Sequence, residues 1–260
     1  MPNHIQTNIT LYGSTEDIDQ FWNLFKVENI EDKLTKTVRK IQVDDSTEPP
    51  KPKYEIDLNK VIPMPSELNI EAEGLHTLLA SRYSQDNDLI AAIQTVPEDV
   101  VASLTPANLK EFIASSCPKT SQATISRLET YSEESYGNFC QAIKNLRKFG
   151  YPSWYEWRVE NWGTKWNAYQ QSRTSANEFS FQTAWSHPSP IIDLLSKMFR
   201  SIVFRVKYAD EDKGHNLGHY TIQSGVVTYR DDFEAGSQAA QRFSCDVWGY
   251  EYEQWLADHS

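Results

Sequence analysis

Two kinds of apolar spacing divide the chain into predicted strands and helices. From His4 to Tyr12, apolar and polar residues alternate, which is the period-2 pattern of a half-buried strand. Ser14 follows at the position of a helix N-cap, with Glu16 and Asp17 in the first turn. The apolar residues behind it keep helical spacing: Ile18, Phe21, Trp22 and Phe25. The chain therefore opens with a predicted strand and an amphipathic helix.

A charged, proline-bearing stretch at residues 31–53 breaks this pattern and predicts a surface loop, with one short strand near Val38 to Val43. Alternation resumes from Tyr54 to Leu58, which predicts a second strand. The prolines of residues 61–65 end it, because proline cannot donate to a strand ladder.

Residues 66–150 carry helical signals and predict an all-helical module. Thr95 before Pro97, and Thr105 before Pro106, place a capping residue ahead of a proline suited to the first helical turn. Further apolar residues keep helical spacing behind them, namely Leu109, Phe112, Ile113, Ile125, Leu128, Tyr131, Tyr136, Phe139, Cys140, Ile143 and Leu146. The polar faces of these helices offer no catalytic grouping.

The C-terminal part returns to mixed structure. Alternation predicts strands at residues 179–185 and 202–208, with a helix starting at Ser189 between them. A hairpin follows over residues 220–229, turning at Ser224-Gly225. Two β–α–β halves around a helical module predict an α+β fold, a ferredoxin-like antiparallel sheet with packed helices that is interrupted by an all-helical insertion.

The predicted domain organisation follows from this pattern. Residues 1–65 form the first half of the ferredoxin-like domain, and residues 66–150 form the helical insertion. Residues 151–260 form an aromatic-rich connector and the second half of the domain, with an acidic C-terminal region.

Composition restricts the class of protein. Of the 260 residues, 39% are hydrophobic and 12% aromatic, which is typical of a folded chain. Apolar runs are too short for a membrane-spanning helix, and the N-terminal residues lack the pattern of a secretory signal. Three cysteines, Cys117, Cys140 and Cys245, do not make a disulfide framework. We therefore expect a cytoplasmic protein.

Charge is distributed unevenly, with a net charge of -11. Lys and Arg number 15 against 22 Asp and Glu in residues 1–150, 7 against 4 in residues 151–209, and 3 against 10 in residues 210–260. The acidic ends would repel a phosphate backbone, which argues against direct nucleic-acid binding. The acidic tail fits a basic surface on another protein, or it is a solvated face that keeps the protein soluble. The candidate partner-binding residues are Asp210, Glu211, Asp212, Asp231 and Asp232.

The densest feature is the aromatic segment of residues 151–169, which holds four of the eight tryptophans. A helix capped by Ser153 would place Trp154 and Trp157 on one face. Aromatic faces with a few polar groups suit a planar ligand of the nucleotide type. Alternatively, the segment is a hinge that packs the insertion onto the sheet. The candidate ligand-binding residues are Trp154, Trp157, Asn161, Trp162, Lys165, Trp166, Asn167 and Trp185.

Signals for catalysis and metal binding are weak. The sequence lacks the G-x-S-x-G, G-x-x-x-x-G-K-[ST] and G-x-G-x-x-G motifs. Residues 210–212 lack the spacing of a calcium loop. His215 and His219 would lie about 13 Å apart on a strand that rises roughly 3.3 Å per residue. The sequence therefore predicts no catalytic residue, no metal ligand and no cofactor.

Several short blocks together resemble the YubB-type family of phage and plasmid proteins. They are Pro2-Asn3-His4, Val61-Ile62-Pro63-Met64-Pro65, Asn161-Trp162-Gly163-Thr164-Lys165-Trp166-Asn167-Ala168, Phe181-Gln182-Thr183-Ala184-Trp185-Ser186 and Tyr208-Ala209-Asp210-Glu211-Asp212. The resemblance spans both ends of the chain but not the region from Ser66 to about Gly150. It implies a ferredoxin-like domain, a mobile-element origin and a bacterial host, and it brings no established activity.

Three hypotheses for function follow. The first is a non-enzymatic phage or plasmid accessory protein that binds and antagonises a host protein, such as a defence component, in the bacterial cytoplasm. The second is a small-ligand binding protein of the nucleotide type that uses the tryptophan-rich segment. The third is an enzyme with an unrecognised site, which no sequence feature favours. An oligomer is compatible with all three.

Overall fold

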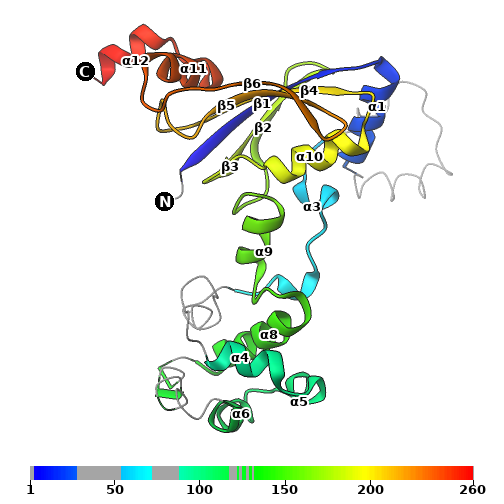
Figure 1. Ribbon diagram of the computed structural model, residues 1–260, viewed down its shortest axis with the longest axis vertical. Helices are drawn as coiled ribbons and strands as arrows, with labels where there is room; N and C mark the ends of the chain where they lie inside the picture. Colours follow the sequence, from blue (N-terminus) through cyan, green and yellow to red (C-terminus); the bar gives the residue numbers. More distant parts are fainter. Residues whose placement is uncertain are drawn as a thin grey trace, which may run out of the picture. The chain divides into compact units, whose positions relative to one another are not determined.

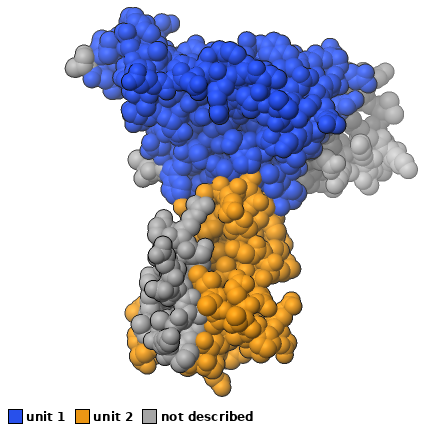
Figure 2. Space-filling model, in the orientation of Figure 1, with its two compact units in different colours: residues 1–63, 162–260 blue, residues 64–161 orange. Residues whose placement is uncertain are grey.

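A computed structural model describes residues 3–27, 54–71, 88–116, 122, 125–126, 129–130 and 132–259. The predicted loop at residues 31–53, its short strand and Cys117 lie outside these ranges. The chain divides into two compact units, shown in Figure 2. Unit 1 comprises residues 1–63 and 162–260, and unit 2 comprises residues 64–161.

Unit 1 is built on a six-stranded sheet in the order β2-β3-β1-β4-β5-β6, in which every neighbouring pair is antiparallel (Figure 1). Helix α1 follows β1 and helix α10 joins β3 to β4, so β1 to β4 have the ferredoxin-like β–α–β–β–α–β arrangement, and β5 and β6 extend it. The α+β prediction is confirmed. The strands are β1 His4–Tyr12, β2 Tyr169–Arg173, β3 Glu178–Ala184, β4 Val203–Asp210, β5 Gly218–Gln223 and β6 Val226–Asp231.

The core of unit 1 lies on one face of this sheet. Ile9 on β1 pairs with Phe179 on β3 and with Val206 on β4, so their apolar side chains share that face. Helices α1 (Thr15–Leu24) and α10 (Ser189–Met198) cover it. The ring of Phe21 on α1 packs against Phe179 at a centroid distance of 5.6 Å. Ser14 caps α1 as predicted.

The opposite face of the sheet carries the alternate, polar residues. Helix α11 (Gln238–Trp248) lies on this side and is followed by α12 (Tyr252–Asp258) (Figure 1). Asn8 Nδ2 donates to Val247 O at 2.8 Å, and Lys207 pairs with Asp246 at 2.9 Å. Polar contacts therefore contribute to holding α11 on the sheet, and α11 also buries the apolar residues Ala240, Cys245 and Val247.

The predicted strand at residues 54–58 is wrong. Tyr54 forms an isolated bridge with Lys26, and Leu58 begins a one-turn helix, α3 (Leu58–Val61). Asp57 caps that helix by accepting from the Asn59 amide at 2.9 Å, and this local bond replaces strand pairing. The second strand of the ferredoxin-like sheet is β2, a short polar segment that lacks the apolar alternation used to find strands.

The described part of unit 2 is helical, as predicted for residues 66–150. Buried apolar residues of α4, α5, α6 and α8, among them Ile93, Phe112 and Ile143, form its core. Pro97 stands immediately before α5 rather than within its first turn. The elements are the 3-10 helix η1 Ser66–Leu68, α4 Asp88–Thr95, α5 Glu98–Ala102, α6 Leu109–Ser116, α8 Glu133–Phe149 and α9 Trp154–Asn161.

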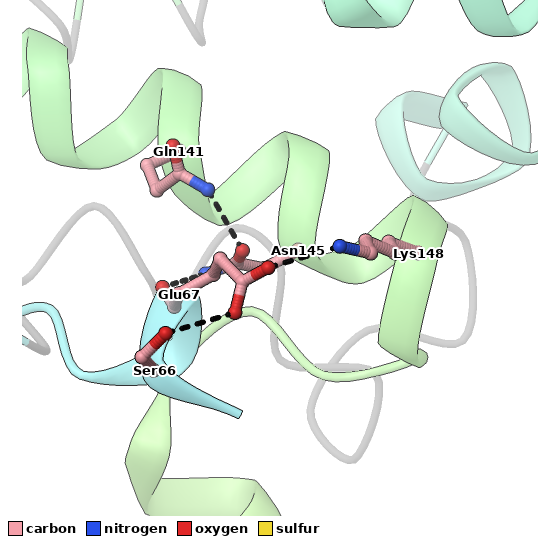
Figure 3. A network of polar contacts seen from close by, with 5 residues as sticks. All are labelled: Ser66, Glu67, Gln141, Asn145 and Lys148. Carbon is pink, nitrogen blue, oxygen red and sulfur yellow. Dashed lines mark hydrogen bonds and ion pairs between the residues drawn. The ribbon is translucent and has the colours of Figure 1, made fainter. Parts of the chain in front are cut away.

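A polar network joins η1 to α8 inside unit 2 (Figure 3). The buried Asn145 amide donates to Glu67 O at 2.8 Å and to Pro152 O at 3.2 Å, and accepts from Gln141 at 2.9 Å. Lys148 pairs with the Glu67 carboxylate at 2.9 Å. The network satisfies the buried amide and holds both ends of the unit's chain against α8.

No described helix is long and apolar enough to cross a bilayer.

Candidate functional site

The predicted ligand-binding residues are divided between the two units. Trp154, Trp157 and Asn161 belong to α9 in unit 2, and the other five belong to unit 1. Ser153 caps α9 through the Tyr155 amide at 3.4 Å, as predicted. Within α9, Trp157 is buried and Asn161 donates to its own helix at Trp157 O, 2.9 Å away. These two side chains therefore have local structural roles.

Two of the unit 1 residues are also part of the frame. Trp162 is 1% exposed and donates its indole N–H to Ile62 O at 2.9 Å. Asn167 accepts from the Leu58 amide at 2.8 Å and donates to Asp57 Oδ1 at 2.7 Å. Both side chains bind the segment that precedes unit 2 in the sequence to the segment that follows it, and both segments belong to unit 1.

Lys165, Trp166 and Trp185 are the predicted residues that do come together at the surface. The Lys165 ammonium lies 4.6 Å from the Trp185 ring centroid and 5.4 Å from that of Trp166, within cation–π range. Trp185 lies just past β3 rather than within a strand, and its φ is +73°. Asn3 O and the Asn216 side chain hold its backbone in this unfavourable conformation, at 2.9 and 3.0 Å.

The acidic residues at the end of β4 divide into buried and exposed. Asp210 is the last residue of β4 and is buried. Its carboxylate accepts from the Asn3 amide at 3.1 Å, the Asn216 amide at 3.3 Å and the Asp212 backbone N–H at 2.9 Å. The sequence analysis made Asp210 a candidate partner-binding residue, but these bonds already occupy its carboxylate within the protein. Glu211 and Asp212 are exposed.

At the end of β6, Asp231 is partly exposed and hydrogen-bonded, whereas Asp232 is fully at the surface. Asp231 lies 2.7 Å from His219 Nδ1 and accepts from the Tyr229 hydroxyl, and these two hydrogen bonds lower the pKa of its carboxyl. Asp232 is exposed. His215 is exposed, and His219 is on β5. Across the described residues, no group of three side chains is placed to hold a metal ion.

A groove of about 810 Å³ where α11 meets α12 escaped the sequence analysis. Gly249, with a φ of +74°, ends α11 and turns the chain so that Tyr250 projects at the corner, 54% exposed. Trp248 is fixed at the base of the groove because its indole N–H donates to Asp210 O at 2.9 Å. The aromatic lining is Trp248, Tyr250 and Trp255, and the acidic lining is Glu211, Glu251 and Asp258.

Lys213 fills part of this groove from the inside. Its ammonium lies 4.5 Å from the Trp248 ring centroid and 5.1 Å from that of Tyr250, and it donates to Glu211 O at 3.0 Å. The side chain is buried, and loss of hydration lowers the pKa of its amine. The groove therefore already holds one cation against aromatic rings and leaves its carboxylates at the surface. An acidic and aromatic mixture over residues 248–258 was the sequence signal for it.

A buried polar chain lies on the core face of the sheet in unit 1. His187 Nδ1 lies 3.1 Å from the Thr7 hydroxyl and Nε2 lies 2.8 Å from the Tyr220 hydroxyl. The His187 ring stacks on Tyr208 at a centroid distance of 4.4 Å. Burial lowers the pKa of His187 to about 3, so the imidazole is neutral at pH 7. Its contacts are those of a core residue.

Two surfaces of unit 1 combine aromatic rings with charged side chains. Carboxylates beside aromatic rings favour a cationic side chain, as Arg242 illustrates by lying 4.1 Å from the Tyr252 ring centroid and 3.0 Å from the Glu253 carboxylate. The Lys165 site presents one cation and two rings instead. The two surfaces thus suit ligands of opposite charge.

Comparison with known proteins found one matching family model. Residues 162–251 match the family model described as the ferredoxin-like domain in Api92-like protein. No curated protein matches the chain. The crystal structure of a protein api92 from Yersinia pseudotuberculosis is similar at 13% sequence identity, over 91% of this chain and 100% of that chain, with a TM-score of 0.34. The matched residues run from Trp162 to Glu251, just before α12, and include β2 to β6; β1, which lies outside them, completes the sheet. Residues 162–251 are therefore similar to the ferredoxin-like domain of Api92-like protein, within an α+β fold.

Proposed function

We propose that the protein is a non-enzymatic binding protein that engages a basic surface on a partner protein through the α11–α12 groove. The observation that carries this proposal is the groove's composition, in which the carboxylates of Glu211, Glu251 and Asp258 line it together with one exposed aromatic ring, Tyr250, and two half-buried ones. Aromatic residues anchor protein interfaces, and carboxylates of one sign select a partner of the other. The 10 acidic residues against 3 basic ones in residues 210–260 extend the same preference around the groove.

The biological setting of the proposal rests on the YubB-type resemblance. In that setting, the protein is an accessory protein of a phage or plasmid that acts in the cytoplasm of a bacterial host. The partner is then a host protein, such as a defence component, whose basic surface is blocked by the groove. The exposed carboxylates Glu211, Asp212 and Asp232 remain candidate contacts, whereas the Asp210 carboxylate is already bonded within its loop.

The experiment is capture of partner proteins from host lysate by the full chain, at low and moderate salt. The test variant carries Glu251→Gln and Asp258→Asn in the groove. The control carries Glu16→Gln and Asp19→Asn on α1, which removes the same number of exposed carboxylates from another helix of unit 1. We expect one stoichiometric partner that the wild type and control retain and the groove variant loses. Binding should also weaken with salt, since exposed charges are screened within about 10 Å at 0.1 M. Equal capture of the partner by both variants would refute the proposal that the groove binds it.

A second candidate function is supported by the Lys165 ammonium lying over the Trp185 and Trp166 rings. A planar anion of the nucleotide type would gain from both ring faces and the cation. Titration of the wild type with a panel of nucleotides should then quench tryptophan fluorescence, and Lys165→Ala should weaken the binding. A flat response to the whole panel would remove this candidate and leave the groove untouched.

A further inference from the structure

The two edges of the sheet differ in how they end. At the β2 edge, the Gln171 side chain accepts from the Ile56 amide at 2.6 Å and donates to Ile56 O at 2.8 Å, and a register shift interrupts the strand between Tyr169 and Ser172. The β2 edge is thus covered by residue 56 and distorted by the register shift. Covering and distortion are two ways in which proteins prevent pairing at a sheet edge. Within the described residues, β6 pairs with β5 alone.

The β6 edge exposes apolar side chains. Val226 is 62% exposed, Val227 48% and Tyr229 49%. The residues of β6, VVTYRD, are mostly β-branched or aromatic and include no proline, which is a composition that favours pairing with a further strand. Residues 226–229 also lack the lysine that commonly protects an exposed edge.

These apolar residues lie on both faces of the sheet. Val227 pairs with Ile222, whose side chain is in the core on the α10 side. Tyr229 pairs with Thr221 and lies on the other face, where its ring meets His219. A partner that docked on one face would leave the other uncovered. An added strand covers both, because its side chains alternate between the two faces.

Charge favours a second copy of this chain as the source of that strand. Residues 213–230 contain no Asp or Glu, whereas the remainder of residues 210–260 contains all 10 acidic residues of the region. Asp231 ends β6, but antiparallel pairing of two β6 strands places it beside the Val226 end of the other copy, so two chains of net charge -11 can meet here without acid facing acid. A two-fold axis would bring β6 against itself, so that the valines and tyrosine of each copy meet those of the other.

We propose that β6 pairs antiparallel with β6 of a second copy and joins the two six-stranded sheets into one. The register shift near Thr228 shortens the edge that can pair. The interface is therefore small, and we expect a dissociation constant in the micromolar range or weaker. This inference concerns self-association and does not depend on the groove.

The test measures the mass of the full chain by analytical ultracentrifugation from about 1 to 500 µM, a range chosen to bracket that weak interface. We expect the mass to rise from one chain to two, and the amides of residues 226–231 to exchange at least tenfold more slowly in the dimer. Val227→Lys and Tyr229→Lys should each raise the dissociation constant at least tenfold. Tyr229→Phe, which keeps the apolar ring, and Ser172→Lys on the β2 edge should leave it unchanged.

Folding of each variant is checked by its far-ultraviolet circular dichroism and thermal unfolding. A single-chain mass at every concentration with unchanged β6 exchange would overturn the proposal. So would a dimer that survives both lysine variants, because another surface would then hold it. Protection of β6 only after a partner from the lysate is added would assign the edge to a foreign strand instead.

Discussion

The aromatic residues of the 162–169 segment and those of the α11–α12 groove look alike in the sequence but differ in the structure. Trp162 is fully enclosed, and Asn167 beside it holds Leu58 and Asp57. Tyr250 projects from the corner between two helices, and Trp255 lines an open groove. The difference teaches that a tryptophan-rich segment can belong to the core, as Trp162 does in the core of unit 1. A binding surface depends instead on a turn that exposes the rings, as Gly249 does for Tyr250.

The largest expected difference between the two regions is in stability. Trp162→Ala should lower the free energy of unfolding by about 3 to 5 kcal/mol, because it removes a buried indole and leaves a cavity. Trp255→Ala, in the groove, should lower it by less than about 1 kcal/mol. Urea unfolding followed by circular dichroism measures both values. Equal losses would show that the groove is part of the core and would break the comparison.

The buried side of the comparison should also respond to pH through His187, which stacks on Tyr208. The folded state holds this imidazole neutral with a pKa of about 3, whereas the unfolded chain titrates near its ordinary value of 6.5. As pH falls below 6.5, the unfolded state binds the extra proton, so stability is lost at up to about 1.4 kcal/mol per pH unit and levels off near pH 3.

Urea unfolding at pH 7, 6 and 5 measures this effect in wild type and His187→Gln. The carboxylates titrate in both proteins, so the difference between their unfolding free energies isolates His187. We expect wild type to be the more stable at pH 7 and its advantage to shrink by about 2 kcal/mol by pH 5. Leu256→Ala, which changes an exposed residue that does not titrate, serves as control and should keep a constant difference from wild type. A constant difference for His187→Gln as well would contradict the neutral buried imidazole.

A smaller effect separates two asparagines of the same aromatic segment. Asn167→Ala leaves the Leu58 amide without its acceptor and should cost about 1 to 3 kcal/mol of unfolding free energy. Asn161→Ala removes a bond from a side chain to its own helix, at Trp157 O, and should cost less than about 0.5 kcal/mol. Thermal unfolding of the two variants compares them directly. A larger loss of unfolding free energy for Asn161→Ala than for Asn167→Ala would show that the bond within α9 is the more important of the two.

Local signals in the sequence were sufficient for most of the fold. The alternation in β1, the Ser14 cap of α1, the Ser189 start of α10 and the Ser224-Gly225 turn each act within a few residues, and the structure has all four. Tyr54 to Leu58 misled the prediction because three alternating residues cannot outweigh the local cap at Asp57. β2 was missed because its polar side chains bind Ile56, far away in the sequence.

The candidate site was less predictable for a related physical reason. Whether a carboxylate is exposed depends on donors brought from elsewhere, as with Asp210, which receives bonds from Asn3 and Asn216. The same holds for Lys213, whose burial depends on Trp248 and Tyr250 arriving from the end of α11. Charge and composition along the chain cannot predict contacts between residues that are distant in the sequence. They did predict the acidic character of the C-terminal region.

The smallest expected effect on stability sharpens the comparison from the exposed side. Tyr250→Ala should change the unfolding free energy by no more than about 0.5 kcal/mol, because the ring is largely exposed. It should nevertheless move the titration of Lys213, whose pKa is lowered by burial beneath Trp248 and Tyr250. Opening one side to water restores hydration of the ammonium, so the midpoint should rise toward the ordinary value of 10.5.

The midpoint is measured from the pH dependence of Lys213 labelling by an amine reagent, read by peptide mass spectrometry in wild type and Tyr250→Ala. Leu256→Ala, an exposed apolar residue of α12, is the matched control and should leave the midpoint in place. If Tyr250→Ala raises only the labelling rate and not the midpoint, the tyrosine restricts access without desolvating the amine. Lys213 would then no longer show that the rings of the groove shield a cation, and the proposal of a basic partner would rest on the composition of the groove alone.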